Sequence, residues 1–396
     1  MLYANVKEIL ESIKDCRISE DYEIIDFFKK GSVGKVCKGK FKKVLSTKFV
    51  ALKFLISKKN KDKENHSEVL IHSKLKHKNI PDIFGYYQVK NGSCIAMELS
   101  DFGDLSNFKR KILKKSYFSE TLICFLSFQI LDAIFYLHTN YKIIHLDIKQ
   151  QNVLIDQYLK VKLSDFSVSL DYKEAKEYID LEREGTSHYI SLEVLEEKRI
   201  EVEEASKIDI YSFGVLLYVL AFCDFPYELI NVKDRDYEQI AKNIREKELT
   251  FPKNKNHSEL FINFLRKCLE KDIKKRYNIY DAKRDPWVRG YKFLLDEKEK
   301  LYNQSKFLIQ MMINNITAAP PLDSRLCSRN MNGAIEAPES LRNKSSLTSV
   351  GRFADAMRNL LSFNSSRCHA QETHLRYAAL YVSGESPPHS RVCRQR

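Results

Sequence analysis

A short stretch of this 396-residue sequence contains two glycines and could bind a phosphate group through its backbone. Residues 27–36 read FFKKGSVGKV, with Gly31 and Gly34 between two segments that have the pattern of β-strands. Because glycine has no Cβ, backbone N–H groups beside it can approach phosphate oxygens closely. On its own, such a stretch is more often a simple hairpin turn, so its meaning depends on the residues that accompany it.

Charged and amide side chains follow this stretch at particular intervals. Lys53 ends the strand pattern VALK, and Glu68 comes 15 residues later in a segment of helical pattern. Residues 145–152 read HLDIKQQN and precede another strand pattern, and Asp165 follows 13 residues after Asn152. Each of these pieces is common by itself. Their order and spacing together are not.

On these residues, the segment from 22 to 290 resembles a eukaryotic protein kinase catalytic domain of the serine/threonine type. Residues 185–193, GTSHYISLE, look like the end of an activation segment, and residues 209–214, DIYSFG, look like the start of the large central helix. The resemblance implies that Arg276 pairs with the glutamate that closes the activation segment, Glu193.

The resemblance implies transfer of the ATP γ-phosphate to serine or threonine hydroxyls of protein substrates. Lys53 would hold the α- and β-phosphates, and Glu68 would fix its ammonium group by an ion pair. Asp147 would act as the catalytic base on the substrate hydroxyl, and Lys149 would steady the γ-phosphate. Lys149 also favours serine/threonine over tyrosine specificity.

A magnesium site and an adenine site are implied as well. Asn152 and Asp165 would bind magnesium, a hard cation that prefers amide and carboxylate oxygens. An Asp-Phe-Gly triplet stands at residues 101–103, but it falls at the end of the expected hinge, residues 98–101, so position favours Asp165 as the metal ligand. The remaining predicted nucleotide contacts are Gly31, Gly34, Val36, Ala51, the gatekeeper Met97, the backbones of Glu98 and Ser100, Asp104 at the ribose, and Leu154.

Three residues depart from the kinase pattern. Lys29 replaces the first glycine of the phosphate loop, and Leu146 replaces the arginine of His-Arg-Asp. Without that guanidinium group, phosphorylation of the activation segment should be less able to switch the enzyme on. Ser167 replaces the glycine that usually follows Asp-Phe, and it would cost about 1 kcal/mol only if a positive φ is needed there.

A histidine occupies a position that is usually apolar. His72 lies one turn after Glu68, where kinases generally carry a residue of the inner spine. We expect a neutral ring packed beside Phe166 rather than a pH switch.

These residues need two kinds of structural element to position them. Before residue 100, short alternating or β-branched segments predict strands, with one helical segment near residues 63–76. The helices predicted after residue 105 are 122–138, 208–222, 236–248 and 260–269. The sequence therefore predicts an α+β, two-lobed protein kinase fold, with a β-rich N-lobe at 22–97, a helical C-lobe at 102–290 and a cleft between them.

Composition is typical of a globular chain, with 43% hydrophobic and 30% charged residues. The longest apolar run, residues 213–222, has about half the ~20 residues of a membrane span, so we expect a buried helix and no membrane association. No signal peptide is visible, and nine scattered cysteines indicate reduced thiols of a cytoplasmic or nuclear protein. The net charge of +13 is dispersed, which favours a lysine-rich solvated surface over a nucleic-acid face.

The composition changes near residue 315. Residues 1–314 contain 45 Lys and 10 Arg, whereas residues 315–396 contain 1 Lys and 10 Arg and are rich in Ser, Ala, Asn and Pro. We expect residues 1–21 to form an N-terminal extension, 291–314 a helical extension, and 315–396 a disordered or weakly ordered tail.

Three other function classes stay open at this point. Nucleic-acid binding by the tail, residues 315–396, has only charge in its favour, 11 basic against 6 acidic residues. An ATP-binding pseudokinase scaffold would be expected to lack Lys53, Asp147 or Asp165, and all three are present. A small-molecule kinase is less favoured, because the 28-residue interval from Asp165 to Glu193 suits a platform that docks a polypeptide.

Overall fold

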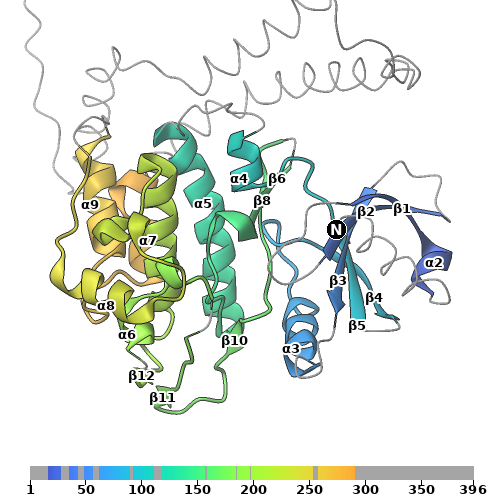
Figure 1. Cartoon of the computed structure of the whole chain (residues 1–396), viewed down its shortest axis with the longest axis horizontal. Helices are drawn as coiled ribbons and strands as arrows, with labels where there is room; N and C mark the ends of the chain where they lie inside the picture. The colour runs from blue at the N-terminus through green and yellow to red at the C-terminus, as the bar shows by residue number, and fades with distance from the viewer. Residues whose placement is uncertain are drawn as a thin grey trace, which may run out of the picture. The chain divides into compact units, whose positions relative to one another are not determined.

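Five antiparallel strands form the first part of the fold (Figure 1). The computed structural model describes residues 17–27, 35–42, 49–56, 62–89, 92–110, 118, 120–156, 158–183, 185–196, 198–252 and 257–289. The predictions for Gly31, Gly34 and Lys29, for most of the N-terminal extension, and for residues 291–396 fall outside these described residues.

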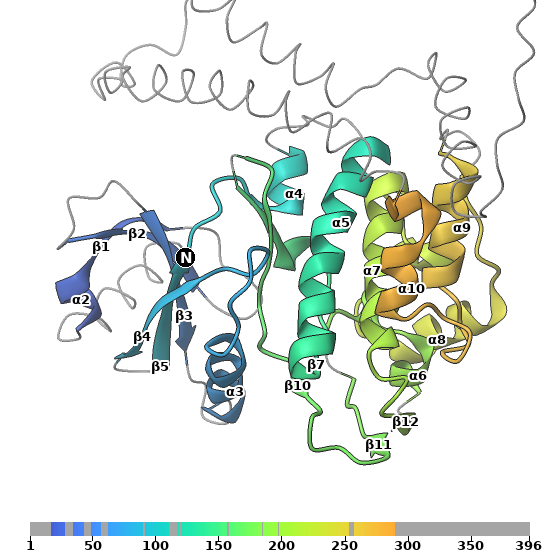
Figure 2. The same ribbon diagram turned by 180° about the vertical axis from the view of Figure 1, so that it is seen from behind.

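The five-stranded sheet has the order β1-β2-β3-β5-β4. Its strands are β1 (Tyr22–Phe27), β2 (Lys35–Phe41), β3 (Phe49–Ile56), β4 (Ile83–Val89) and β5 (Gly92–Glu98). The single-turn helix α2 (Ile18–Asp21) precedes the sheet, and Ile18 is buried in its core. Helix α3 (Asp62–His72) lies on the side of the sheet that is turned toward the helical part of the fold (Figures 1 and 2).

Alternation along β3 decides which of its side chains face α3. The even-numbered residues of the strand pack into the core on the far face: Val50, Leu52 and Phe54. Ala51 and Leu55 pack on the opposite face, together with Val69 of α3. Because successive side chains of a strand point to opposite faces, Lys53 also lies on the α3 side.

The second part of the fold is helical. Its α-helices are α4 (Leu105–Phe108), α5 (Glu120–Tyr136), α6 (Leu192–Leu195), α7 (Lys207–Phe222), α8 (Tyr237–Glu246), α9 (Glu259–Cys268) and α10 (Ile279–Arg284). Shorter helical segments accompany them: the π-helical η2 (Leu137–Tyr141) and the 3-10 segments η3 (Gln150–Asn152), η4 (Ser187–Tyr189) and η5 (Pro226–Asn231). The predicted strand-rich and helical parts are confirmed, with element ends that differ from the prediction by a few residues.

Short strands pair with one another within the second part of the fold. Strand β8 (Val153–Ile155) pairs with β6 (Gly103–Asp104) and with β9 (Val161–Leu163). Strand β7 (Ile143–Ile144) pairs with β10 (Leu170–Asp171), and β11 (Tyr178–Ile179) pairs with β12 (Ile200–Glu201). These pairings hold the chain on both sides of residue 165 against the helical part.

Two long apolar helices form the centre of the helical part. Every residue of α7 is buried, which confirms the buried helix predicted for residues 213–222. The segment Leu122–Tyr141 is long and apolar enough to cross a membrane by length and composition alone, but it is largely buried inside the fold, and core helices commonly have such a composition. Helices α5 and α7 lie side by side in both views (Figures 1 and 2).

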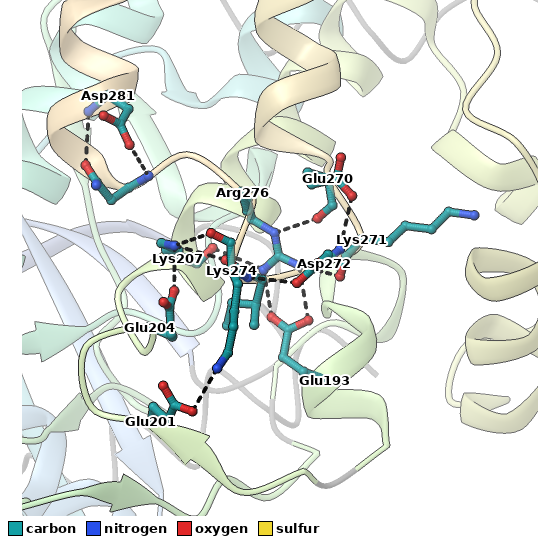
Figure 3. A network of polar contacts seen from close by, with 12 residues as sticks. Glu193, Glu201, Glu204, Lys207, Glu270, Lys271, Asp272, Lys274, Arg276 and Asp281 are labelled. Atoms are coloured by element: carbon teal, nitrogen blue, oxygen red, sulfur yellow. Dashed lines mark hydrogen bonds and ion pairs between the residues drawn. The ribbon is translucent and has the colours of Figure 1, made fainter.

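A buried ion pair joins the segment that ends at Glu193 to the helical core (Figure 3). Arg276 donates from Nη1 and Nη2 to the two carboxylate oxygens of Glu193 at 2.7 and 3.1 Å, and from Nε to the carbonyl oxygen of Glu270 at 2.8 Å. Its guanidinium group lies over the ring of Tyr211, 4.9 Å from the ring centroid. Burial would raise the pKa of Glu193, but Arg276 outweighs this effect and lowers it. The predicted pairing of Arg276 with Glu193 is confirmed.

Replacing Arg276 by methionine should lower the free energy of unfolding by about 3–5 kcal/mol, because it leaves the Glu193 carboxylate buried without its charge partner. Urea denaturation of the variant and the wild type measures this loss. The matched control is Lys275→Met, whose side chain is 76% exposed and whose loss should stay within about 0.5 kcal/mol. A loss below about 1 kcal/mol for Arg276→Met would contradict the structural role of the pair.

Candidate active site

The ammonium group of Lys53 connects three elements. Its Nζ donates to Oε1 of Glu68 on α3 at 2.6 Å and to Oδ1 of Asp165, beyond β9, at 2.8 Å. Burial would lower the pKa of Lys53, but the two carboxylates outweigh burial and raise it. The predicted Lys53–Glu68 ion pair is therefore formed, and Asp165 joins it.

Four of the predicted nucleotide contacts share one face of the sheet. The strand register places Val36 opposite Lys53 and Ala51 opposite Met97. Residues directly opposite each other in an antiparallel pair point to the same side. Ala51 and Met97 are buried in the cluster on the α3 side, and Val36 packs against that cluster. This face presents apolar side chains next to one ammonium group.

The predicted hinge follows this face. Strand β5 ends at Glu98, and Ser100 is 6% exposed with a hydroxyl that has no hydrogen-bond partner within the described residues. Asp104 caps α4 by accepting from the N–H of Asn107 at 2.8 Å. The register of β6 and β8 places Leu154 opposite Asp104. The hinge thus leads directly to Asp104, which lies beside Leu154 on the paired strand.

A buried carboxylate holds the backbone that carries Asp147. Asp209, at the start of α7, accepts from the N–H groups of His145 at 2.8 Å and Leu146 at 2.9 Å, and it is bonded to Nε2 of His138 at 2.8 Å. Leu146 has a φ of 64°, in a region that is uncommon for residues other than glycine. The sequence marked Asp209 only as the start of a helix, because the N–H groups that it binds lie more than 60 residues earlier.

Asp147 is the centre of a hydrogen-bonded cluster. Its carboxylate accepts from Nζ of Lys149 at 2.6 Å, from Nδ2 of Asn152 at 2.8 Å and from the hydroxyl of Thr186 at 3.0 Å. Lys149 also donates to the Thr186 hydroxyl at 2.6 Å. Because Asn152 uses its amide nitrogen for Asp147, its amide oxygen is turned away from that carboxylate. The predicted residues Asp147, Lys149 and Asn152 come together as expected.

Thr186 is a site residue that the sequence analysis missed. It follows Gly185, whose φ is 93° and at which a Cβ would lie 2.6 Å from the carbonyl oxygen of Leu146. Glycine is therefore needed to bring the two segments this close. The Gly-Thr pair was the only signal in the sequence, and it does not show which loop the hydroxyl meets.

The backbone around Asp165 shows whether Ser167 needs the positive φ that would make a serine costly there. Asp165 has a φ of 71°, whereas Ser167 is not among the residues with positive φ, so the conformational cost considered for this serine does not arise here. Burial would raise the pKa of Asp165, but Lys53 and a side-chain hydrogen bond with Ser167 outweigh burial and lower it. Asp101, the first residue of the Asp-Phe-Gly triplet, lies exposed in a turn after β5. Asp165 is the aspartate that meets Lys53.

Three aromatic rings connect α3 to the Asp147 loop. Phe166 lies between His72 and His145, with ring centroids at 4.9 and 5.1 Å. His72 donates from Nε2 to the carbonyl oxygen of Pro81 at 2.8 Å. Burial lowers the pKa of His72 to about 4, so the ring is neutral at physiological pH. The expectation of a neutral histidine packed beside Phe166 is confirmed.

The donors near Asp165 fit a magnesium ion that also binds phosphates. Among the described residues, no group of three or more His, Cys, Asp or Glu side chains could form a metal centre. Magnesium in phosphate sites needs only one or two protein oxygens beside the phosphates and water. The Asp165 carboxylate and the Asn152 amide oxygen are donors of this kind.

Comparison with known proteins decides the family. The family model of the protein kinase domain matches residues 22–288. The chain belongs to the protein kinase family. The predicted family and the two-lobed kinase fold are thereby confirmed, and membership implies the use of ATP and magnesium in general.

Several characterised kinases are similar to this one. It is 34% identical over 247 residues to calcium-dependent protein kinase 6 of Plasmodium berghei, a match that covers 61% of this chain and 16% of the relative. It is 29% identical over 248 residues to serine/threonine-protein kinase CHK1 of Saccharomyces cerevisiae, covering 62% and 46%. An Aurora kinase of Eremothecium gossypii is 27% identical over 284 residues, covering 69% and 72%. The matches span less than half the length of the first two relatives.

Replacing Ser167 by glycine should change the turnover of the kinase by less than about twofold, because the serine has a φ that any residue adopts. Its hydroxyl contributes less than Lys53 does to lowering the pKa of Asp165, so Asp165 should stay charged without it. Steady-state assays of Ser167→Gly and of a Ser167→Ala control measure this. A tenfold or larger change in the glycine variant alone would show that the backbone at this position limits turnover.

Replacing His72 by leucine should make the kinase less sensitive to acid. The pKa of His72 falls from its ordinary 6.5 to about 4 on folding, so the unfolded chain takes up the proton first as the pH falls. Stability that is present above pH 6.5 is therefore lost toward pH 4. Between pH 7 and pH 5, wild type should lose about 2 kcal/mol more unfolding free energy than His72→Leu. Equal losses in urea denaturation at both pH values would contradict a buried, neutral ring.

Proposed function

We propose that this kinase transfers the γ-phosphoryl group of ATP to serine and threonine hydroxyls of protein substrates. The observation that carries the proposal is that two sets of charged groups are each held by hydrogen bonds. Lys53 is paired with Glu68 and Asp165, and Asp147 is bonded to Lys149 and Thr186. Phosphoryl transfer depends mainly on such positioning and neutralisation of charge.

ATP fits the face of the sheet and the hinge. The apolar side chains of Val36, Ala51 and Met97 would cover the adenine ring, and Leu154 would contact it from the other lobe. The backbones of Glu98 and Ser100 would bind the adenine edge, and Asp104 would bind the ribose. The buried Ser100 hydroxyl has no hydrogen-bond partner among the described residues. Because buried polar groups normally have a partner, a bound ligand would supply one here. Gly31 and Gly34 would complete the phosphate contacts.

Asn152 and Asp165 would hold magnesium, and Lys53 would hold the α- and β-phosphates. When bound, the ion supplies neutralisation of charge on the phosphate oxygens. Glu68 keeps the ammonium of Lys53 directed toward the site, and the ammonium in turn donates to Asp165. These residues together would fix the phosphates for an in-line attack.

Asp147 would accept the proton of the substrate hydroxyl. As the hydroxyl oxygen bonds to the γ-phosphorus, the bond from that phosphorus to the bridging oxygen breaks and ADP leaves. Lys149 lies 2.6 Å from the Asp147 carboxylate and would balance the charge on the γ-phosphate. Thr186 bonds to both residues and would hold them in register.

A pseudokinase that binds ATP without transferring phosphate is the second candidate. Leu146 and Lys29 favour it, because both replace residues of the active pattern. The retained Lys53, Asp147 and Asp165, together with the formed Lys53–Glu68 pair, support the active kinase instead.

The direct test is phosphate transfer by the full chain with magnesium, radiolabelled ATP and a generic basic protein, followed by analysis of the phosphorylated amino acids. Phosphoserine and phosphothreonine are expected. Asp147→Asn should lower turnover by about 100-fold or more, because the amide cannot accept the proton. Glu238→Gln, an exposed carboxylate on α8, is the control and should match wild type. Equal labelling by wild type and Asp147→Asn would favour the pseudokinase, and phosphotyrosine would overturn the specificity.

Activity should depend little on phosphorylation of the activation segment. The segment is held by pairing of β10 with β7 and of β11 with β12, and the guanidinium of Arg199 lies 4.9 Å from the ring centroid of Tyr178. Leu146 offers no charge to a phosphate in this segment. Treatment with a phosphatase should therefore change turnover by less than about threefold. A larger fall that is reversed by incubation with ATP would contradict this expectation.

A further inference from the structure

A buried lysine contacts the hinge from the other lobe. Lys162 lies on β9 and is 4% exposed. Its Nζ donates to Oε2 of Glu98 at 2.5 Å and to the carbonyl oxygen of Ile80 at 3.3 Å. Glu98 is the last residue of β5, where the chain leaves the sheet for the hinge. One ammonium group thus links the hinge, the loop between α3 and β4, and a strand of the helical lobe.

Glu98 is fixed by a second set of contacts. Its N–H donates to the carbonyl oxygen of Asp82 at 2.8 Å, and the N–H of Asp82 donates to Oε2 of Glu98 at 3.3 Å. The same carboxylate oxygen therefore accepts from Asp82 and from Lys162. Loss of the lysine would leave this oxygen with the long bond from Asp82.

Asn79 binds the residues of β9 directly before and after Lys162. Asn79 donates from Nδ2 to the carbonyl oxygen of Val161 at 2.9 Å, and its own carbonyl oxygen accepts from the N–H of Leu163 at 2.8 Å. Asp165 follows two residues after Leu163. The position of the metal-binding carboxylate and the position of the hinge are thus set by neighbouring contacts of one short strand.

A lysine is a costly choice for a buried place. Removing an ammonium from water is unfavourable, and an apolar side chain of similar volume would often give equal or greater stability. The Glu98 carboxylate is about one third exposed, so the pair adds little stability after screening by solvent. What the pair provides is a fixed position for Glu98.

We propose that Lys162 is a positioning residue for the nucleotide: it holds Glu98 so that the hinge backbone meets the adenine while β9 places Asp165 at the phosphates. This inference rests on the proposed ATP site. It predicts that Lys162 acts on nucleotide affinity through Glu98, without touching the nucleotide itself.

The test compares the full chain with Lys162→Met and with Lys160→Met, an exposed lysine immediately before β9. Titration calorimetry gives the dissociation constant for ADP with magnesium, and hydrogen exchange of the nucleotide-free proteins reports on the amides of Asp82 and Glu98. For Lys162→Met we expect a dissociation constant about tenfold higher, the effect of roughly one lost charge-assisted hydrogen bond, and faster exchange at both amides. Lys160→Met should match wild type in both measurements.

A second comparison separates positioning from general loss of stability. Glu98→Gln should weaken ADP binding to a similar degree, and adding Lys162→Met to it should weaken binding by less than about twofold more, because both changes remove one interaction. Lys162→Arg should restore most of the affinity.

The outcomes separate this inference from the proposed function. A variant Lys162→Met that unfolds more easily but binds ADP as wild type does would overturn the inference, as would additive effects of the two substitutions. A wild-type chain that binds ADP but transfers no phosphate would overturn the proposed activity alone. Failure of the wild type to bind ADP would overturn both.

Discussion

The carboxylate of Asp209 is the contact on which the rest of the site depends. It lies fully buried at the start of α7 and accepts two consecutive backbone N–H groups of the loop that carries Asp147. Burial would raise the pKa of Asp209, but the contacts with His138 and His145 together outweigh burial and lower the pKa, so the carboxylate stays charged. This charge holds Leu146 in a left-handed backbone conformation that the loop would not keep alone. The helical core thereby fixes the loop that carries Asp147.

From that loop, contacts continue into the strand-rich lobe. The ring of His145 packs on Phe166, which packs on His72 of α3, and α3 carries Glu68 to Lys53. Each step is a packed ring or a buried ion pair. This continuity explains how a chain without the usual arginine at position 146 can still have its charged groups in place.

Part of this arrangement was predictable from the sequence. The pairing of Lys53 with Glu68 was predicted through the resemblance to protein kinases, which rests on the order and spacing of these residues with the other motifs. The contacts of Asp209 and Thr186 were not predictable, since their partners are backbone or side-chain atoms of loops far away in the chain. The effect of Ser167 was not predictable either, because it depends on one backbone angle, and the positive φ is found at the preceding aspartate instead.

Two aspartates, Asp165 and Asp101, are candidates for the metal ligand. Oδ1 of Asp165 accepts a hydrogen bond from Nζ of Lys53 at 2.8 Å. Asp101 begins a complete Asp-Phe-Gly triplet but lies exposed in a turn. The decisive measurement is the magnesium dependence of phosphate transfer in Asp165→Asn and Asp101→Asn. We expect Asp165→Asn to lose transfer at all magnesium concentrations and Asp101→Asn to follow the wild-type curve. Loss of transfer in Asp101→Asn, with a wild-type curve for Asp165→Asn, would contradict the assignment of this site.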